Sequence, residues 1–259
     1  MKVNLANQVA LVTGAARGIG KAIADLFARN GAHVVYSDVD LPGAKDSAAS
    51  TGGEAMALDV TDAGQVEAVV AAIVKQHGRL DIAVNNAGVN TLAHRVPIDQ
   101  FPQEEWERIL KVDLHGVFLV SRAVAQEMRR QQSGRIINIA SIAGLVPLRL
   151  QCPFIAAKAG VVNLTRGMAL ELGPHGILVN GIAPGSTLTD GTRKLFYGED
   201  GKFKDSVRQM LAHIPLGRPG TTEEIAHAAL FLAAPESSYV NGHILTVDGG
   251  WTAGYHRDF

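Results

Sequence analysis

The sequence predicts a doubly wound α/β fold, in which helices cover both faces of one parallel sheet. The run at residues 9–12 is almost wholly apolar, which is typical of a strand buried on both faces. The segment that follows carries apolar residues at helical spacing between residues 19 and 27. Strands and helices continue to alternate without a linker or an internal repeat. Residues 1–259 are therefore expected to form a single domain.

The bulk composition limits the class of protein. The chain is 47% hydrophobic and 19% charged, which provides enough apolar material for a folded core. A net charge of -1, without long runs of one sign, predicts neither a nucleic-acid nor a membrane partner. The nine histidines show no metal-ligand spacing, and the single cysteine, Cys152, cannot form an internal disulfide. With no apolar signal segment at its start, the protein is expected to be cytoplasmic.

The expected elements follow one another in order. Asp62 and Gln65 match a capping box at the start of a helix that Gly78 closes, and Thr221 with Glu224 repeats that pattern. Strands are expected at residues 9–12, 32–38, 54–60, 81–88, 134–141, 176–183 and 243–247. Helices are expected at residues 19–27, 66–74, 101–130 with a junction near 113–116, 154–172, and from 221 onward.

Three glycines, Gly14, Gly18 and Gly20, join the first strand to the first helix. Free backbone N–H groups and the positive end of the helix dipole point at such a turn, so the unit predicts a diphosphate cradle. An ordinary βα turn is the alternative, because the spacing G-x-x-x-G-x-G is wider than the common G-x-G-x-x-G fingerprint. Residues 13–20 resemble the cofactor loop of the short-chain dehydrogenases/reductases, and this resemblance implies a Rossmann-like fold.

Asp38 indicates which dinucleotide is bound. It ends the second expected strand, 18 residues after Gly20, close to the spacing at which a carboxylate meets the adenosine ribose. A carboxylate accepts hydrogen bonds from a free 2′-hydroxyl and repels a 2′-phosphate. No arginine or lysine follows until Lys45, so NAD is the expected cofactor.

Other stretches match cofactor-binding positions of the same family. Residues 85–88 match the family's NNAG motif, and residues 184–189 resemble its Pro-Gly turn, which holds the nicotinamide carboxamide. The resemblance implies cofactor contacts from Gly14, Arg17, Gly18, Ile19, Gly20, Asp38, Asp59, Val60, Asn86, Ala87, Gly88, Lys158, Pro184, Gly185, Thr187 and Thr189.

The family transfers a hydride between a secondary alcohol and a nicotinamide, and its members use a serine, a tyrosine and a lysine to handle the hydroxyl proton. Ser141 and Lys158 match two of these positions. The tyrosine belongs 13 residues after the serine and four before the lysine, where this chain has Phe154. Phenylalanine has no oxygen, and loss of a general acid or base typically costs about 10²–10⁴-fold in rate.

Two explanations account for Phe154. One is an engineered tyrosine-to-phenylalanine change in an active dehydrogenase, which the intact Ser141 and Lys158 favour. The other is a naturally silent relative that still binds the dinucleotide. A further departure is Asp113, which stands where many relatives have a catalytic asparagine. Its role in catalysis, as opposed to a helix-breaking role, stays open at this point.

Polar residues near these positions are candidates for substrate binding. Asn90 and His94 follow the NNAG stretch, and Arg149 and Gln151 lie between Ser141 and Phe154. With Ser141 and Phe154 they would line a polar pocket, which suits a sugar, a polyol or an acidic sugar derivative. A β-ketoacyl reductase is a third hypothesis, weakened by Asp38 because that role usually uses NADPH.

Two further segments have expected roles. The polar, irregular stretch around residues 186–214 is long enough to form a substrate lid. The tail at residues 251–259 carries three aromatic residues. Family members are usually homotetramers with C-termini at subunit contacts, so this tail fits such an interface, and the alternative is that it folds back on its own core.

Overall fold

The centre of the molecule is one parallel sheet. The computed structural model describes residues 3–90, 94–189, 192, 196–198 and 202–254. Seven strands pair in the order β3-β2-β1-β4-β5-β6-β9, and each neighbouring pair is parallel. The strands are β1 (Val9–Thr13), β2 (His33–Asp38), β3 (Glu54–Ala57), β4 (Ile82–Asn85), β5 (Gly134–Ile139), β6 (Ile177–Pro184) and β9 (Ile244–Val247).

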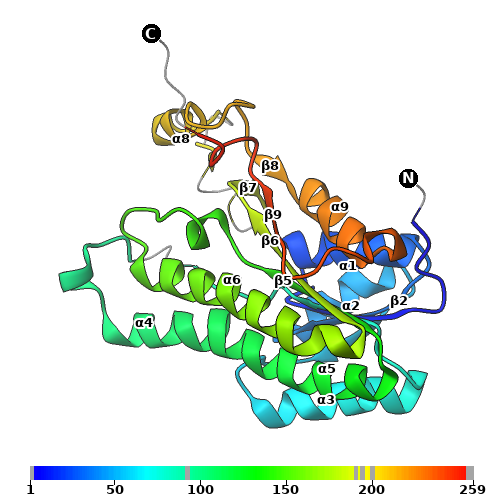
Figure 1. The fold of residues 1–259 in the computed structure, drawn as a ribbon. Coiled ribbons are helices and arrows are strands. Elements are labelled where there is room, and N and C mark those ends of the chain that lie inside the picture. The colour runs from blue at the N-terminus through cyan, green and yellow to red at the C-terminus, as the bar shows by residue number, and fades with distance from the viewer. Residues whose placement is uncertain (1–2, 91–93, 190–191, 193–195, 199–201, 255–259) are drawn as a thin grey trace.

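Helices cover both faces of this sheet, which confirms the doubly wound fold (Figure 1). Phe27 of α1 and Ile225 of α9 share one buried apolar cluster. Ile73 of α3 and Val124 of α5 belong to the cluster on the other face. The longer helices are α1 (Gly18–Arg29), α2 (Leu41–Ala49), α3 (Ala63–His77), α4 (Gln103–Leu110), α5 (Val117–Gln131), α6 (Cys152–Leu172), α8 (Asp205–Leu211) and α9 (Thr222–Ala233).

Short elements complete the framework. β7 (Thr187–Leu188) and β8 (Gly220–Thr221) form a separate parallel pair. The helical turns are η1 (Ile98–Gln100), η2 (Lys111–Gly116), η3 (Ile142–Gly144), η4 (Gly173–His175) and η5 (Pro235–Ser237). The turn η2 is π-helical and joins α4 to α5, so the expected junction near residues 113–116 is a local widening of the helix.

The strand order reverses between β1 and β4. The chain winds outward from β1 through β2 to β3, then returns to place β4 on the other side of β1. Connections from β1 and β4 therefore leave in opposite directions at the carboxyl edge and open a crevice between them. In open α/β sheets this reversal point is where ligands bind. The candidate site lies at this edge.

Three local expectations need correction. β3 ends at Ala57, because the chain turns where the Asp62 N–H donates to the Asp59 carbonyl, so Asp59 and Val60 follow the strand. β5 ends at Ile139, and Ser141 instead caps η3. Asp62 caps α3, but the Gln65 side-chain oxygen accepts from the Asp59 N–H, so the reciprocal bond of a capping box is not formed.

The expected capping box of α9 is confirmed, whereas the expected lid segment and the tail are only partly described by the structure. Thr221 and Glu224 form the complete capping box of α9. The segment around residues 186–214 contains β7 and α8, while residues 190–191, 193–195 and 199–201 lie outside the described residues. Residues 255–259 of the tail also lie outside them. Within the described part of the chain, no helix is long and apolar enough to cross a membrane.

Candidate functional site

The glycine loop requires glycine for geometric reasons. Gly18 has φ +61°, in the left-handed region that disfavours a side chain. A Cβ on Gly20 would lie 2.2 Å from the Gly14 carbonyl oxygen, so α1 packs against the loop only because residue 20 has no side chain. Arg17 occupies the N-cap of α1 and makes no side-chain cap hydrogen bond. The N–H groups of the first turn therefore remain uncapped by Arg17, as an anion cradle requires.

Side chains at the ends of β1 and β4 hold this loop. The Thr13 hydroxyl oxygen accepts hydrogen bonds from the backbone N–H groups of Asn86 and Ala87, each at 3.0 Å. The Asn86 side-chain amide donates to the carbonyls of Thr13 at 2.9 Å and Gly14 at 3.0 Å. Asn86 thus positions the glycine loop directly. This gives the NNAG stretch a structural role at the crevice.

A cleft of about 440 Å³ lies in this crevice. It joins the glycine loop to residues that follow β2, β3 and β4. Eleven expected cofactor residues line it: Gly14, Arg17, Gly18, Ile19, Asp38, Asp59, Val60, Asn86, Ala87, Gly88 and Thr189. Gly20, Lys158, Pro184, Gly185 and Thr187 are expected cofactor residues outside this lining.

Four apolar residues of the lining were not expected from the sequence: Val39, Leu58, Val89 and Val112. Three of them directly adjoin the motif residues Asp38, Asp59 and Gly88. Their place beside a motif is the signal that would have identified them. Apolar walls with a few fixed polar groups are typical of cofactor sites, so the lining fits a dinucleotide.

Asp38 is held rigidly at the edge of the cleft. Its Oδ2 accepts the Ala16 N–H at 3.1 Å, and its Oδ1 accepts the Asp40 N–H at 3.0 Å. Both oxygens keep a lone pair, because a carboxylate oxygen can accept more than one hydrogen bond. The carboxylate is thereby oriented for a further donor such as a hydroxyl. Arg17 lines the same cleft and is the basic group that an additional phosphate would meet.

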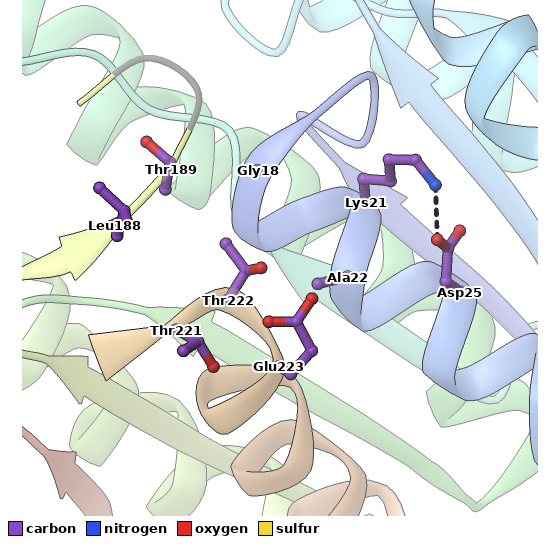
Figure 2. Close-up of a pocket in the computed structure, with 9 residues that line it drawn as sticks. All are labelled: Gly18, Lys21, Ala22, Asp25, Leu188, Thr189, Thr221, Thr222 and Glu223. Carbon is purple, nitrogen blue, oxygen red and sulfur yellow. Dashed lines mark hydrogen bonds and ion pairs between the residues drawn. The ribbon is translucent and has the colours of Figure 1, made fainter. Parts of the chain in front are cut away.

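The Pro-Gly turn brings Thr189 to the glycine loop. A Cβ on Gly18 would lie 3.7 Å from the Thr189 side chain, an ordinary contact distance. Figure 2 shows Thr189 on one side of Gly18 and the first residues of α9 on another, around a second cavity of about 430 Å³. In this cavity Lys21 and Asp25 of α1 form an ion pair at 2.5 Å. Gly18 and Thr189 line both spaces, so the two cavities adjoin.

Lys158 lies beside the cleft in a buried, charged corner. Its side chain is 6% exposed, and its ammonium donates to the Ile139 carbonyl at 3.1 Å. Asp113 Oδ2 lies 3.2 Å from the Lys158 Nζ, and the Asp113 side chain is fully buried. A Cβ on Gly88, which lines the cleft, would lie 3.3 Å from Asp113 Oδ2 and 3.5 Å from Nζ. Gly88 therefore borders both the cleft and this corner.

Phe154 and Ser141 complete this corner. The Lys158 Nζ lies 5.6 Å from the centroid of the Phe154 ring, one helical turn earlier on α6. Such a distance is typical of a cation–π contact. The Ser141 hydroxyl oxygen accepts the Ala143 N–H at 3.1 Å, which leaves its own hydrogen free to donate. Ser141 follows β5 just after Ile139, the residue to which Lys158 donates.

The candidate substrate residues differ in their surroundings. Gln151 is buried at the N-cap of α6, whereas Arg149 is exposed. His94 is 44% exposed, with its Nδ1 3.9 Å from a Glu105 oxygen. The Asn90 carbonyl accepts a hydrogen bond from Arg108 at 3.4 Å. The shared role of these four residues in substrate binding stays a prediction.

The described residues hold no cluster of three or more histidine, cysteine, aspartate or glutamate side chains that could bind a metal ion. The polar groups of the site lie around the cleft and the corner at Lys158. Together they offer a dinucleotide cradle, a carboxylate at its edge, and a buried ammonium that contacts an aromatic ring and the strand end two residues before Ser141. Such a set can bind an anionic cofactor and orient an alcohol oxygen.

Comparisons with known proteins agree with this arrangement. A family model described as Enoyl-(Acyl carrier protein) reductase matches residues 14–252. The chain is 42% identical to the 3-oxoacyl-(acyl-carrier-protein) reductase FabG of Vibrio cholerae, over 96% of this chain and 98% of that one. It is 38% identical to the NAD-dependent glycerol dehydrogenase of Listeria innocua, over 96% and 95%. The structure of levodione reductase matches with a TM-score of 0.89 at 35% identity, covering 96% and 99% of the two chains.

Proposed function

Since the chain belongs to the short-chain dehydrogenase/reductase family, we propose that it is an NAD-dependent dehydrogenase whose proton-transfer step is disabled by Phe154. Proteins of this family are NAD(P)-dependent oxidoreductases that act on CH–OH groups. The proposed substrate is a secondary alcohol or hemiacetal of a sugar, a polyol or an acidic sugar derivative. The Tyr-to-Phe change and the choice of NAD are the specific parts of this proposal.

One observation carries the proposal. The buried Lys158 ammonium contacts both a phenylalanine ring and a carboxylate, and it lies beside Gly88, which lines the cleft. Asp113 and the Ile139 carbonyl offset the cost of burying this charge, and the place of the ammonium beside the ring at position 154 supports a role in the reaction. Position 154 is where a phenol would receive the influence of this cation.

The reaction requires one hydride and one proton to leave the alcohol. The bound nicotinamide supplies the hydride acceptor, and the residues of this chain handle the oxygen and its proton. Ser141 would donate its free hydroxyl hydrogen to the substrate oxygen and so orient it. Lys158 would hold the nicotinamide ribose. Phe154 stands where the proton acceptor belongs and has no atom to accept it.

The preference for NAD is proposed from Asp38. Its carboxylate is fixed by two backbone N–H groups at the cleft edge, where it would accept from a ribose hydroxyl and repel a phosphate. The NAD-dependent glycerol dehydrogenase is consistent with this preference and with a polyol substrate. The polar residues Asn90, Arg149 and Gln151 would recognise hydroxyl groups.

Two other functions have observations in their favour. Arg17 lines the cleft and would bind the 2′-phosphate of NADP, which suits a ketoreductase like the related FabG. Phe154 itself suits a naturally silent protein that binds NAD(H) without turnover. The three functions predict different turnover by a Phe154→Tyr variant and different cofactor preferences.

The test compares the unaltered chain with Phe154→Tyr on aldoses, polyols and acidic sugars with NAD, and on an acetoacetyl thioester with NADPH. We expect turnover of one sugar or polyol class to rise by about 10²–10⁴-fold in the tyrosine variant. Reduction of the thioester alone would favour the ketoreductase. No turnover on any compound, with NADH binding retained, would establish the silent binding protein.

A further inference from the structure

The side chain of Asp113 has an unusual set of contacts. Its Oδ1 accepts the Val89 N–H at 2.7 Å, so it fixes the loop after β4. Its Oδ2 has no hydrogen-bond partner among the described residues, although it lies 3.2 Å from the Lys158 Nζ. The contact with lysine is therefore an ion pair without an aligned hydrogen bond. The Asp113 carboxylate thus contacts both Val89 in the cleft wall and the ammonium of Lys158.

Among the described residues, the ion-pair partner of Lys158 is this carboxylate. The facing group from η2 is Asp113, and α6 itself contributes the Phe154 ring. The turn η3 has Ser141 at its N-cap, and the loop after β4 contributes the backbone of Gly88. The helix α4 carries Arg108, which is paired with Glu105 and acts on Asp113 from further away.

We propose that Asp113 is a positioning residue that neutralises Lys158 and thereby controls how readily a phenol at position 154 ionises. An unpaired ammonium favours a nearby phenolate by direct charge attraction. A carboxylate 3.2 Å from the same ammonium offsets that attraction and also repels the phenolate. Restoring tyrosine alone therefore gives a phenol that ionises at higher pH than it would beside an uncompensated lysine.

This inference rests on the proposed function for its relevance to catalysis, so its test uses a readout that does not need turnover. The phenolate of residue 154 is titrated by its near-ultraviolet absorbance, as the difference between Phe154→Tyr proteins and matched Phe154 proteins. The second change is Asp113→Asn, which keeps the Oδ1 acceptor for Val89 and removes the charge. Asp62→Asn removes an exposed helix-cap carboxylate as the matched control.

The expected result is a phenol pKa about one unit or more lower in Phe154→Tyr/Asp113→Asn than in Phe154→Tyr, with no change from Asp62→Asn. The pH at which turnover reaches half its maximum should move by the same amount. A phenol pKa that is the same with and without the Asp113→Asn change would overturn the inference. A shift without turnover in either protein would leave the inference standing and count against the proposed function.

A second pair of variants covers the case in which the unpaired Lys158 prevents folding of the Asp113→Asn protein. Both carry Phe154→Tyr and Lys158→Met, and one of them also carries Asp113→Asn. The phenol pKa should be higher in the protein that keeps Asp113, because only the repulsion by its carboxylate remains. Equal pKa values in these two proteins would also overturn the inference.

Discussion

The cofactor cleft and the corner at Lys158 adjoin each other but depart from the family pattern to different extents. In the cleft, Thr13 and Asn86 hold the glycine loop through hydrogen bonds between neutral groups, and eleven of the expected cofactor residues line the space. In the corner, the two side chains that contact Lys158, Phe154 and Asp113, stand where the family resemblance predicts a tyrosine and an asparagine. Under the proposed function, cofactor binding and proton transfer are separable in this molecule, and only proton transfer is altered.

The largest effect is expected from breaking the ion pair of the corner. Lys158→Met leaves the Asp113 carboxylate buried without its cation, which should lower the free energy of unfolding by about 3–5 kcal/mol. Denaturant unfolding measures this loss. The double variant Lys158→Met/Asp113→Asn, which has no unpaired charge, should recover most of it. A Lys158→Met protein as stable as the unaltered chain would contradict the ion pair between Lys158 and Asp113.

A change in the cleft should reduce binding. Gly20→Ala places a Cβ 2.2 Å from the Gly14 carbonyl oxygen, so the loop must move, and NADH affinity should fall by about 1–3 kcal/mol. Fluorescence titration with NADH measures this. Gly167→Ala is the control, because a Cβ there meets nothing within 4 Å inside α6. Unchanged affinity in Gly20→Ala would show that the loop does not bind the cofactor.

A smaller effect should follow from the charge at the cleft edge. Asp38→Asn keeps one backbone acceptor and removes the charge, so the ratio of NADP to NAD affinity should rise about tenfold, or about 1.4 kcal/mol. Asp40→Asn is the matched control, because Asp40 caps α2 two residues away. If both variants change the ratio equally, Asp38 has no specific role.

The smallest effect should come from a buried group outside both regions. The Tyr36 hydroxyl donates to Asp25 at 2.9 Å and lies 2.8 Å from the Thr51 hydroxyl, and burial raises the pKa of this phenol. A raised pKa stabilises the fold below about pH 10, the unfolded value, and this contribution is lost as the pH rises above it. Tyr36→Phe should lower the free energy of unfolding by about 1 kcal/mol at neutral pH. The further loss of stability that Tyr36 causes above about pH 10 should be absent in this variant.

Unfolding measured between neutral and alkaline pH tests this dependence. Tyr239→Phe is its control, because Tyr239 is fully exposed. NADH affinity should be the same in both tyrosine variants, since neither residue lines the cleft. If the free energy of unfolding still falls with rising alkaline pH in Tyr36→Phe, a group other than Tyr36 causes that fall.

The sequence was sufficient to predict what depends on local pattern. Apolar runs and helical spacing predicted the sheet and its two layers, and the motifs predicted most of the cleft lining. The ion pair was not predictable, because Asp113 and Lys158 are 45 positions apart and meet only through the packing of η2 against α6. The bounds of β3 and β5 were also missed, since turn hydrogen bonds rather than hydrophobicity end those strands.

The central claim is that the cleft is intact while the proton acceptor is missing. Its most direct test measures NADH affinity and steady-state NADH formation on the same preparations of the unaltered chain and of Phe154→Tyr. The substrate is the class of aldose, polyol or acidic sugar that Phe154→Tyr turns over. We expect equal NADH affinities and a turnover about 10²–10⁴-fold higher in Phe154→Tyr. Equal turnover by both proteins, or NADH binding by neither, would contradict it.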